Sequence, residues 1–153
     1  MSLNSIDELI RDQVVDLLAS EGITLEGAPV DNIFANDEEG IPSSVSVPAI
    51  MVDIADDGDV STASNDQSEG TAILLITGVE ASQGVGPRAK ERAKSLIASA
   101  KKTLDDNPTG LAEWGVVERA WTFGSTHIVQ EAEVVLAICP LHVPYIYSLG
   151  RLS

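Results

Sequence analysis

The chain is poor in cysteine and in aromatic residues. Of its 153 residues, one is cysteine, Cys139, and 4% are aromatic. A single cysteine excludes an internal disulfide and is typical of a reducing compartment. Its position in the apolar run VVLAICP indicates a buried thiol rather than a nucleophile. A chain of this length is expected to fold as one domain, with a core built mainly from aliphatic side chains.

Basic residues are also scarce, because nine lysines and arginines stand against 24 aspartates and glutamates, for a net charge of −15. So acidic a chain is not expected to bind nucleic acids or anionic membranes on its own. Its apolar runs are all shorter than the roughly 18 residues that a membrane-spanning helix needs. The N-terminus lacks the basic and apolar regions of a signal peptide. These features predict a soluble, intracellular protein.

Catalytic and metal-binding patterns are missing as well. His127 and His142 have no neighbouring ligands at zinc spacing, and a Gly-x-Ser-x-Gly motif is absent. The acids at 53–59 resemble a calcium loop only in part, because Ser64 stands where a bidentate glutamate is needed. We therefore expect no catalysis, cofactor or metal. An alternative stays open, in which the turn Ser82–Gly86 and the basic helix after it bind an anionic ligand.

Two segments predict amphipathic helices. Ser5-Ile-Asp-Glu8 is a capping box, apolar residues follow at helical spacing, and Gly22 suits a helix end, which predicts a helix over 6–21. A second helix is predicted over 87–104, with proline at its first position. Its apolar residues fall within an arc of about 100°; they are Ala89, Ala93, Leu96, Ile97, Ala100 and Leu104.

The remaining segments predict a sheet. Four β-rich runs, at 47–54, 71–81, 115–123 and 128–139, are expected to be its main strands, with a possible short strand at 30–34. Residues 55–70 are acidic and polar and are expected to form an exposed loop. The order of elements predicts one α+β domain over residues 1–139. It would have a mostly antiparallel four-stranded sheet and two main helices on one side. Residues 140–153 are expected to form an extended C-terminal arm.

The second helix has an unusual charge pattern. Residues 88–102 hold six of the chain's nine basic residues. Arg88/Arg92 and Lys90/Lys94 are like-charged i,i+4 pairs, each unfavourable by about 0.2–0.5 kcal/mol. They also crowd the half of the helix where the macrodipole already places positive charge. We expect Arg88, Lys90, Arg92 and Lys94 to face acidic surface on a neighbouring copy or an adjoining ring, with pairing inside the same chain as the alternative.

Two further segments are expected to contact partners. Asp56, Asp57 and Asp59 lie in the acidic segment, whose composition does not offset the entropy of ordering without a partner. Val143, Tyr145 and Ile146 lie beyond the last predicted strand, where two prolines prevent a helix. They are expected to dock outside their own core.

A basic helix on an acidic chain is complementary to other surfaces of the same molecule. Such heterologous contacts close into rings or continue as filaments.

The order of features over residues 5–139 has a further implication. A capped helix is followed by an irregular loop with Ile33-Phe-Ala-Asn36, and then by the strand Pro48-Ala-Ile-Met-Val52. An acidic segment, an apolar strand, a helix and a pair of strands complete the order. This arrangement resembles the tail terminator (minor tail, tail completion) proteins of long-tailed bacteriophages. The resemblance implies an α+β fold and a hexameric ring that ends tail-tube polymerisation, without catalytic residues.

The resemblance also implies a location and partners. The protein would be part of the virion, in the tail or neck, and would occupy the host cytoplasm during assembly. Its partners would be further copies of itself, the tail tube protein and a neck or connector protein, with no membrane partner. Specific nucleic-acid binding is not implied, although the lumen of a ring could pass DNA. The apolar arm after Pro140 leaves a related neck, tube or tail-completion role open.

Overall fold

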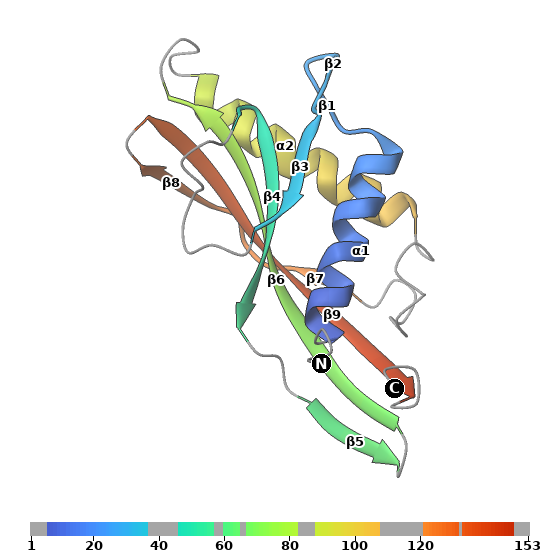
Figure 1. Ribbon diagram of the computed structural model, residues 1–153. Coiled ribbons are helices and arrows are strands. Elements are labelled where there is room, and N and C mark those ends of the chain that lie inside the picture. Colours follow the sequence, from blue (N-terminus) through green and yellow to red (C-terminus); the bar gives the residue numbers. More distant parts are fainter. Residues whose placement is uncertain are drawn as a thin grey trace.

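The computed structural model describes residues 6–36, 46–56, 60–64, 67–82, 88–107, 121–131 and 133–148. Within these residues the chain forms two helices, α1 (Ile6–Glu21) and α2 (Arg88–Asp106). Both helices pack on the same face of a twisted sheet, whose two long central strands run the length of the molecule (Figure 1). The structure is therefore α+β, as the sequence predicts.

Helix α1 has the predicted bounds, whereas α2 begins one residue later and ends two residues later than predicted. The Gly22 N–H donates to the Leu18 carbonyl at 3.3 Å, and Gly22 has a φ of +80°, the left-handed conformation that closes a helix at glycine. The buried residues of α2 are the six that helical spacing places on one side: Ala89, Ala93, Leu96, Ile97, Ala100 and Leu104. Both helices thus follow from local sequence signals.

The sheet is larger than predicted and is mixed rather than only antiparallel. Among the described residues it has seven strands, with the order β3-β4-β6-β9-β7, while β5 pairs with β6 and β8 pairs with β9. The strand bounds are β3 (Asn32–Ala35), β4 (Ala49–Asp56), β5 (Val60–Ser64), β6 (Gln67–Ala81), β7 (Thr122–Phe123), β8 (His127–Glu131) and β9 (Val134–Ser148). Strand β3 runs parallel to β4, and the other pairings are antiparallel. A separate hairpin joins β1 (Thr24–Leu25) and β2 (Ala28–Pro29).

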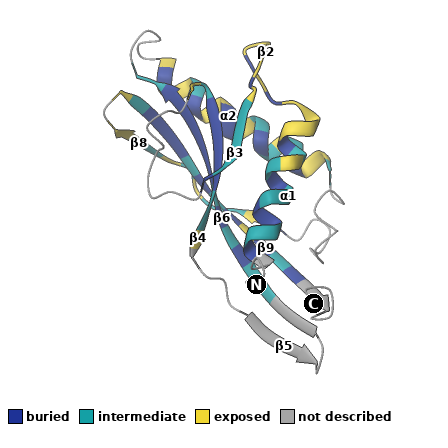
Figure 2. Ribbon diagram, in the orientation of Figure 1, coloured by how far each residue is buried: buried dark blue, intermediate teal, exposed yellow. Residues whose placement is uncertain are grey.

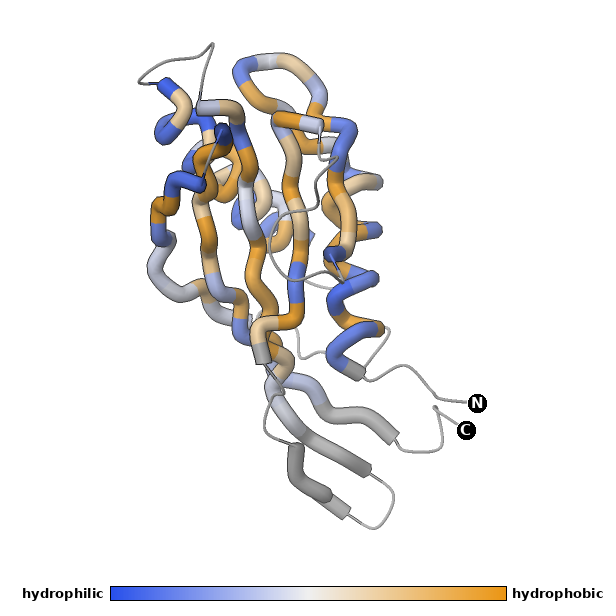
Figure 3. The backbone as a smooth tube through the Cα atoms, turned by 60° about the vertical axis from the view of Figure 1, so that its left-hand side comes forward, coloured by the Kyte–Doolittle hydropathy of each residue, from blue (hydrophilic) through white to orange (hydrophobic). Residues whose placement is uncertain are grey.

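Alternate residues of the central strands divide between two apolar clusters, one on each face of the sheet. The main core lies beneath the helices and takes Ile50 and Val52 from β4, and Leu74 and Ile76 from β6. A smaller cluster on the opposite face contains Ala49, Met51, Val79 and Leu136. Figures 2 and 3 show the buried and apolar positions running along these strands. Period-two alternation thus places apolar side chains on both faces of the sheet.

Helix α2 lies directly on β6 at Gly78. A β-carbon added there would be 2.8 Å from the Ala93 carbonyl oxygen and 2.9 Å from the Leu96 β-carbon. Only glycine allows this approach of helix to strand. The contact fixes the height of α2 above the sheet and therefore the position of its charged side chains.

The predicted C-terminal arm is wrong for residues 140–148, which continue β9. These residues pair with residues 67–75 of β6, and Leu141, Val143 and Tyr145 are 0–1% exposed in the main core. The two prolines predict an end to regular structure, but a proline in a strand lacks only the backbone N–H donor. The Pro140 carbonyl accepts from the Gly124 N–H, so the side of this residue that lacks an N–H faces away from β6.

Three other expectations differ from the structure. Residues 60–64 and 67–70, expected to lie in a loop, form β5 and the start of β6, because backbone pairing does not require apolar side chains. The single strand expected over 128–139 is divided between β8 and β9, which pair antiparallel with each other. Of the strand expected over 115–123, residues 115–120 lie outside the described residues.

Candidate functional site

The N-terminal half of α2 is tied to the rest of the domain by an ion-pair network. The Arg92 guanidinium donates through Nε to Glu80 on β6 at 2.9 Å and through Nη1 to Glu26 at 2.6 Å. Arg88 pairs with the other carboxylate oxygen of Glu26. The Glu80 side chain is 4% exposed and also accepts the Ala81 N–H at 2.9 Å. The hydrogen bond that Arg92 donates to the Glu80 carboxylate is the main cause that raises the pKa of Arg92.

The turn between β1 and β2 positions Glu26 for these contacts. Glu26 and Gly27 have φ values of +52° and +84°, the pair of left-handed residues that a two-residue type I′ hairpin turn requires. Arg88 and Arg92 therefore pair with acidic groups of their own chain, which is the alternative and not the predicted contact with a neighbouring copy. Because the network anchors α2 to both the sheet and the hairpin, its first role is structural.

Three lysines of α2 lie on a different side of the helix from these arginines. Lys90, Lys94 and Lys101 fall within about 40° of one another at 100° per residue, and we call them the lysine flank. Lys90 and Lys94 are exposed, while the Lys101 ammonium lies 5.5 Å from the centre of the Phe123 ring. Lys94 is 3.9 Å from Glu91, but both side chains are more than half exposed, and such a pair contributes at most about 1 kcal/mol.

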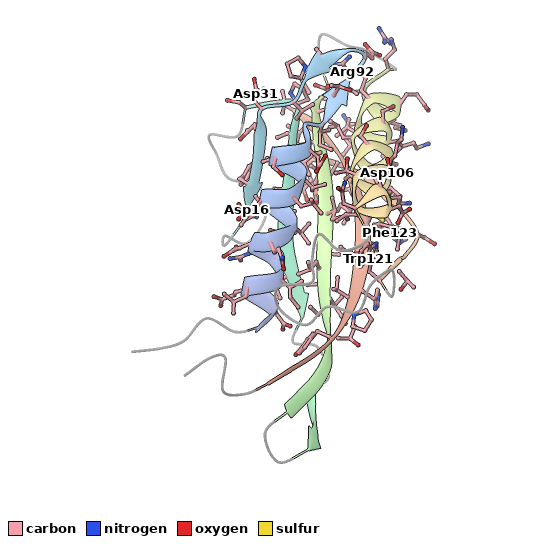
Figure 4. All side chains as sticks on the ribbon, turned by 90° about the vertical axis from the view of Figure 1, so that its right-hand side faces the viewer. Asp16, Asp31, Arg92, Asp106, Trp121 and Phe123 are labelled. Atoms are coloured by element: carbon pink, nitrogen blue, oxygen red, sulfur yellow. The ribbon has the colours of Figure 1, made fainter. Side chains whose placement is uncertain are left out.

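Helix α1 has the opposite charge on its outer side. Glu8, Asp12 and Asp16 follow one another at i,i+4 spacing, and we call them the acidic face. The Asp12 side chain is 48% exposed and accepts from Arg11 at 3.1 Å, and Asp16 is exposed. Figure 4 shows Asp16 on the side of α1 that points away from α2. Sequence reasoning missed this face, although the i,i+4 spacing of the acids was a visible signal.

The other residues expected to contact partners are placed differently. Val143 and Tyr145 are buried in the main core, so the expectation that they dock on a partner is wrong. Asp56 is the last residue of β4, and Ile146 lies in β9; the surroundings of their side chains are not described. Asp57 and Asp59 lie outside the described residues, as do residues 83–86 of the turn considered for anion binding.

A partly open cavity of about 350 Å³ lies between the C-terminal ends of α1 and α2. Glu21 and Thr24 line one side, and Ser99, Lys102 and Asp106 line the other. Its lining carries both signs of charge.

No group of three or more potential metal ligands occurs among the described residues. Nor is any helix in that part of the chain long and apolar enough to span a membrane.

Comparison with known proteins returned structural likeness without sequence relatives. No family model matches the chain, and no curated protein matches it. Among solved structures, it is similar to a chain in the virion of the native gene transfer agent (GTA) particle, with a TM-score of 0.50 and 13% identity. The alignment covers 75% of this chain and 78% of the other. Coverage this even means that most of each chain takes part in the match, and the two chains share the α+β fold.

Proposed function

We propose that this protein is a structural subunit of a phage-like virion, and that it forms a homo-oligomeric ring at the tail or neck. The observation that carries the proposal is the fold similarity to a chain of the GTA virion across three quarters of both chains. A tail terminator or tail completion role agrees with the order of sequence features described above. In this role the protein would have no catalytic activity, cofactor or membrane partner.

The surface charges support self-assembly. A lysine flank and an acidic face on one chain provide two complementary surfaces, and contacts between different surfaces of identical subunits generate closed rings or open filaments. A hexamer is the ring that the terminator role implies. The tail tube protein and a neck or connector protein would bind its two faces, and assembly would take place in the host cytoplasm.

An anionic-ligand role has less support. Two of the four basic residues on which it relied, Arg88 and Arg92, are already paired with Glu26 and Glu80 of the same chain. A small anion near the start of α2 would have to compete with these carboxylates. We therefore do not propose this function.

Size measurement tests the proposal directly. Sedimentation velocity over a wide range of protein concentrations, with negative-stain electron microscopy of the same samples, should show discrete ring particles of one stoichiometry. Addition of purified tail tubes from a phage that encodes this protein should place the rings at tube ends. A protein that stays monomeric at all concentrations, both alone and with tubes, would contradict the proposed function.

A further inference from the structure

The lysine flank and the acidic face lie at opposite sides of the same helical layer. Helix α1 packs over β3 and β4, and α2 packs over β6 and β9. Asp16 points away from α2 (Figure 4), whereas Lys101 contacts Phe123 on β7, which lies at the end of the strand order opposite β3. One flank of the domain therefore presents carboxylates and the opposite flank presents ammonium groups. The two cannot meet within one molecule.

The two surfaces are similar in length and have one charge spacing in common. From Glu8 to Asp16 the acidic face extends about 12 Å, at 1.5 Å per residue. The lysine flank extends about 16 Å from Lys90 to Lys101 on the same basis. In each helix two neighbouring charges stand about 6 Å apart along the axis. Two helices laid side by side can therefore bring several opposite charges together at once.

The basic residues of α2 divide into two groups with different roles. Arg88 and Arg92 are occupied by Glu26 and Glu80. On the lysine flank, the contact with a carboxylate in the described residues is the long, exposed one between Lys94 and Glu91. The arginines hold the helix in place, and the lysines remain accessible to another molecule.

We propose that the lysine flank of one copy binds the acidic face of α1 on the next copy, so that subunits join head to tail through their helical layers. This inference rests on the proposed function, because it specifies the contact between neighbouring subunits of the ring. A second copy is favoured over nucleic acid as the occupant, since the chain has a net charge of −15 and itself supplies the matching acidic surface.

Charge reversal tests this contact. Lys94→Glu on the lysine flank and Asp16→Lys on the acidic face are each expected to weaken self-association at least about tenfold, because each replaces an attraction with a repulsion. Lys102→Glu and Asp106→Lys are matched controls with the same changes in charge. Both line the cavity on another side of α2 and should associate like the unmodified protein. Sedimentation equilibrium measures the association, and circular dichroism verifies that each variant is folded.

Mixing the two interface variants is the decisive step. In an equimolar mixture of Lys94→Glu and Asp16→Lys proteins, the two reversed surfaces again have opposite charges, and the two unmodified surfaces still match. Particles of unmodified size should therefore reappear. The neutral variants Lys94→Gln and Asp16→Asn should weaken association in the same direction but less.

The outcomes separate the inference from the function on which it rests. If the unmodified protein forms rings and the two reversals leave them intact, the head-to-tail contact is wrong while the proposed function stands. Loss of rings without recovery on mixing would also overturn the head-to-tail contact. If the unmodified protein never assembles, both the contact and the proposed function are wrong.

Discussion

Shortening the chain after Cys139 is expected to abolish folding. The deletion removes the second half of β9 and leaves residues 67–75 of β6 without that partner. It also removes Leu141, Val143 and Tyr145, each 0–1% exposed, from the main core. Burial of each aliphatic side chain contributes about 1.5–3 kcal/mol. A buried aromatic side chain covers roughly 150–250 Å², which adds about 4–6 kcal/mol at about 25 cal/mol per Å².

The sum, about 7–12 kcal/mol, is comparable to the whole stability of a typical domain, about 5–15 kcal/mol. A chain ending at Cys139 should therefore lack a cooperative thermal transition and native circular dichroism. A docking arm, by contrast, could be deleted without loss of folding. A shortened chain that unfolds cooperatively would show that residues 140–148 are dispensable to the core.

A pair of neighbouring substitutions tests the same strand in the full-length protein. Leu141→Ala should lower the free energy of unfolding by about 2–5 kcal/mol, because it leaves a cavity beneath the helices. His142→Ala changes an exposed side chain on the opposite face of the strand and should alter stability by less than about 0.5 kcal/mol. Urea unfolding followed by far-UV circular dichroism measures both. Equal effects of the two substitutions would refute the assignment of alternate faces.

Three other outcomes are expected. Gly78→Ala should destabilise the domain by about 1–3 kcal/mol in thermal melts, because the new methyl group meets the α2 backbone. Gly124→Ala should destabilise the domain less, because its methyl group meets only a proline ring at 3.2 Å. Arg92→Ala should lower the free energy of unfolding in urea by about 1–3 kcal/mol, because it removes the main partner of the buried Glu80 carboxylate. Arg88→Ala removes an exposed pair and should lower that free energy by less than about 1 kcal/mol. Ring formation measured by sedimentation should be strongest at intermediate salt. Repulsion between chains of net charge −15 is screened at a Debye length of about 8 Å in 0.15 M salt, while the contact pairs weaken near 1 M, where that length is about 3 Å.

The two helices could be predicted from sequence because their signals are local. A capping box, a terminal glycine and the 3.6-residue spacing of apolar side chains all lie within the segment that they define. Both helices accordingly appear at the predicted bounds, within a residue or two. The α+β class followed from the order of these elements among the β-rich runs.

Strand pairing depends on residues far apart in the chain, and there the sequence signals were misleading. Two prolines in residues 140–148 suggested an arm, but the tertiary structure directs the missing donor of Pro140 away from β6. Polar residues at 60–64 suggested a loop, yet they pair with β6 through backbone groups. In both cases side-chain composition was a weak guide, because a strand is stabilised by backbone groups whose partners local sequence does not reveal.

The charged surfaces show the same division. The concentration of basic residues on α2 was evident from sequence, and so was its mismatch with the helix dipole. Only the tertiary structure showed that the two arginines are paired with carboxylates of the same chain. It brings Glu26 to Arg88, 62 residues away, and Glu80 beneath Arg92. Helical periodicity assigns each side chain to a side of its helix, but what that side faces depends on how the helix packs on the sheet.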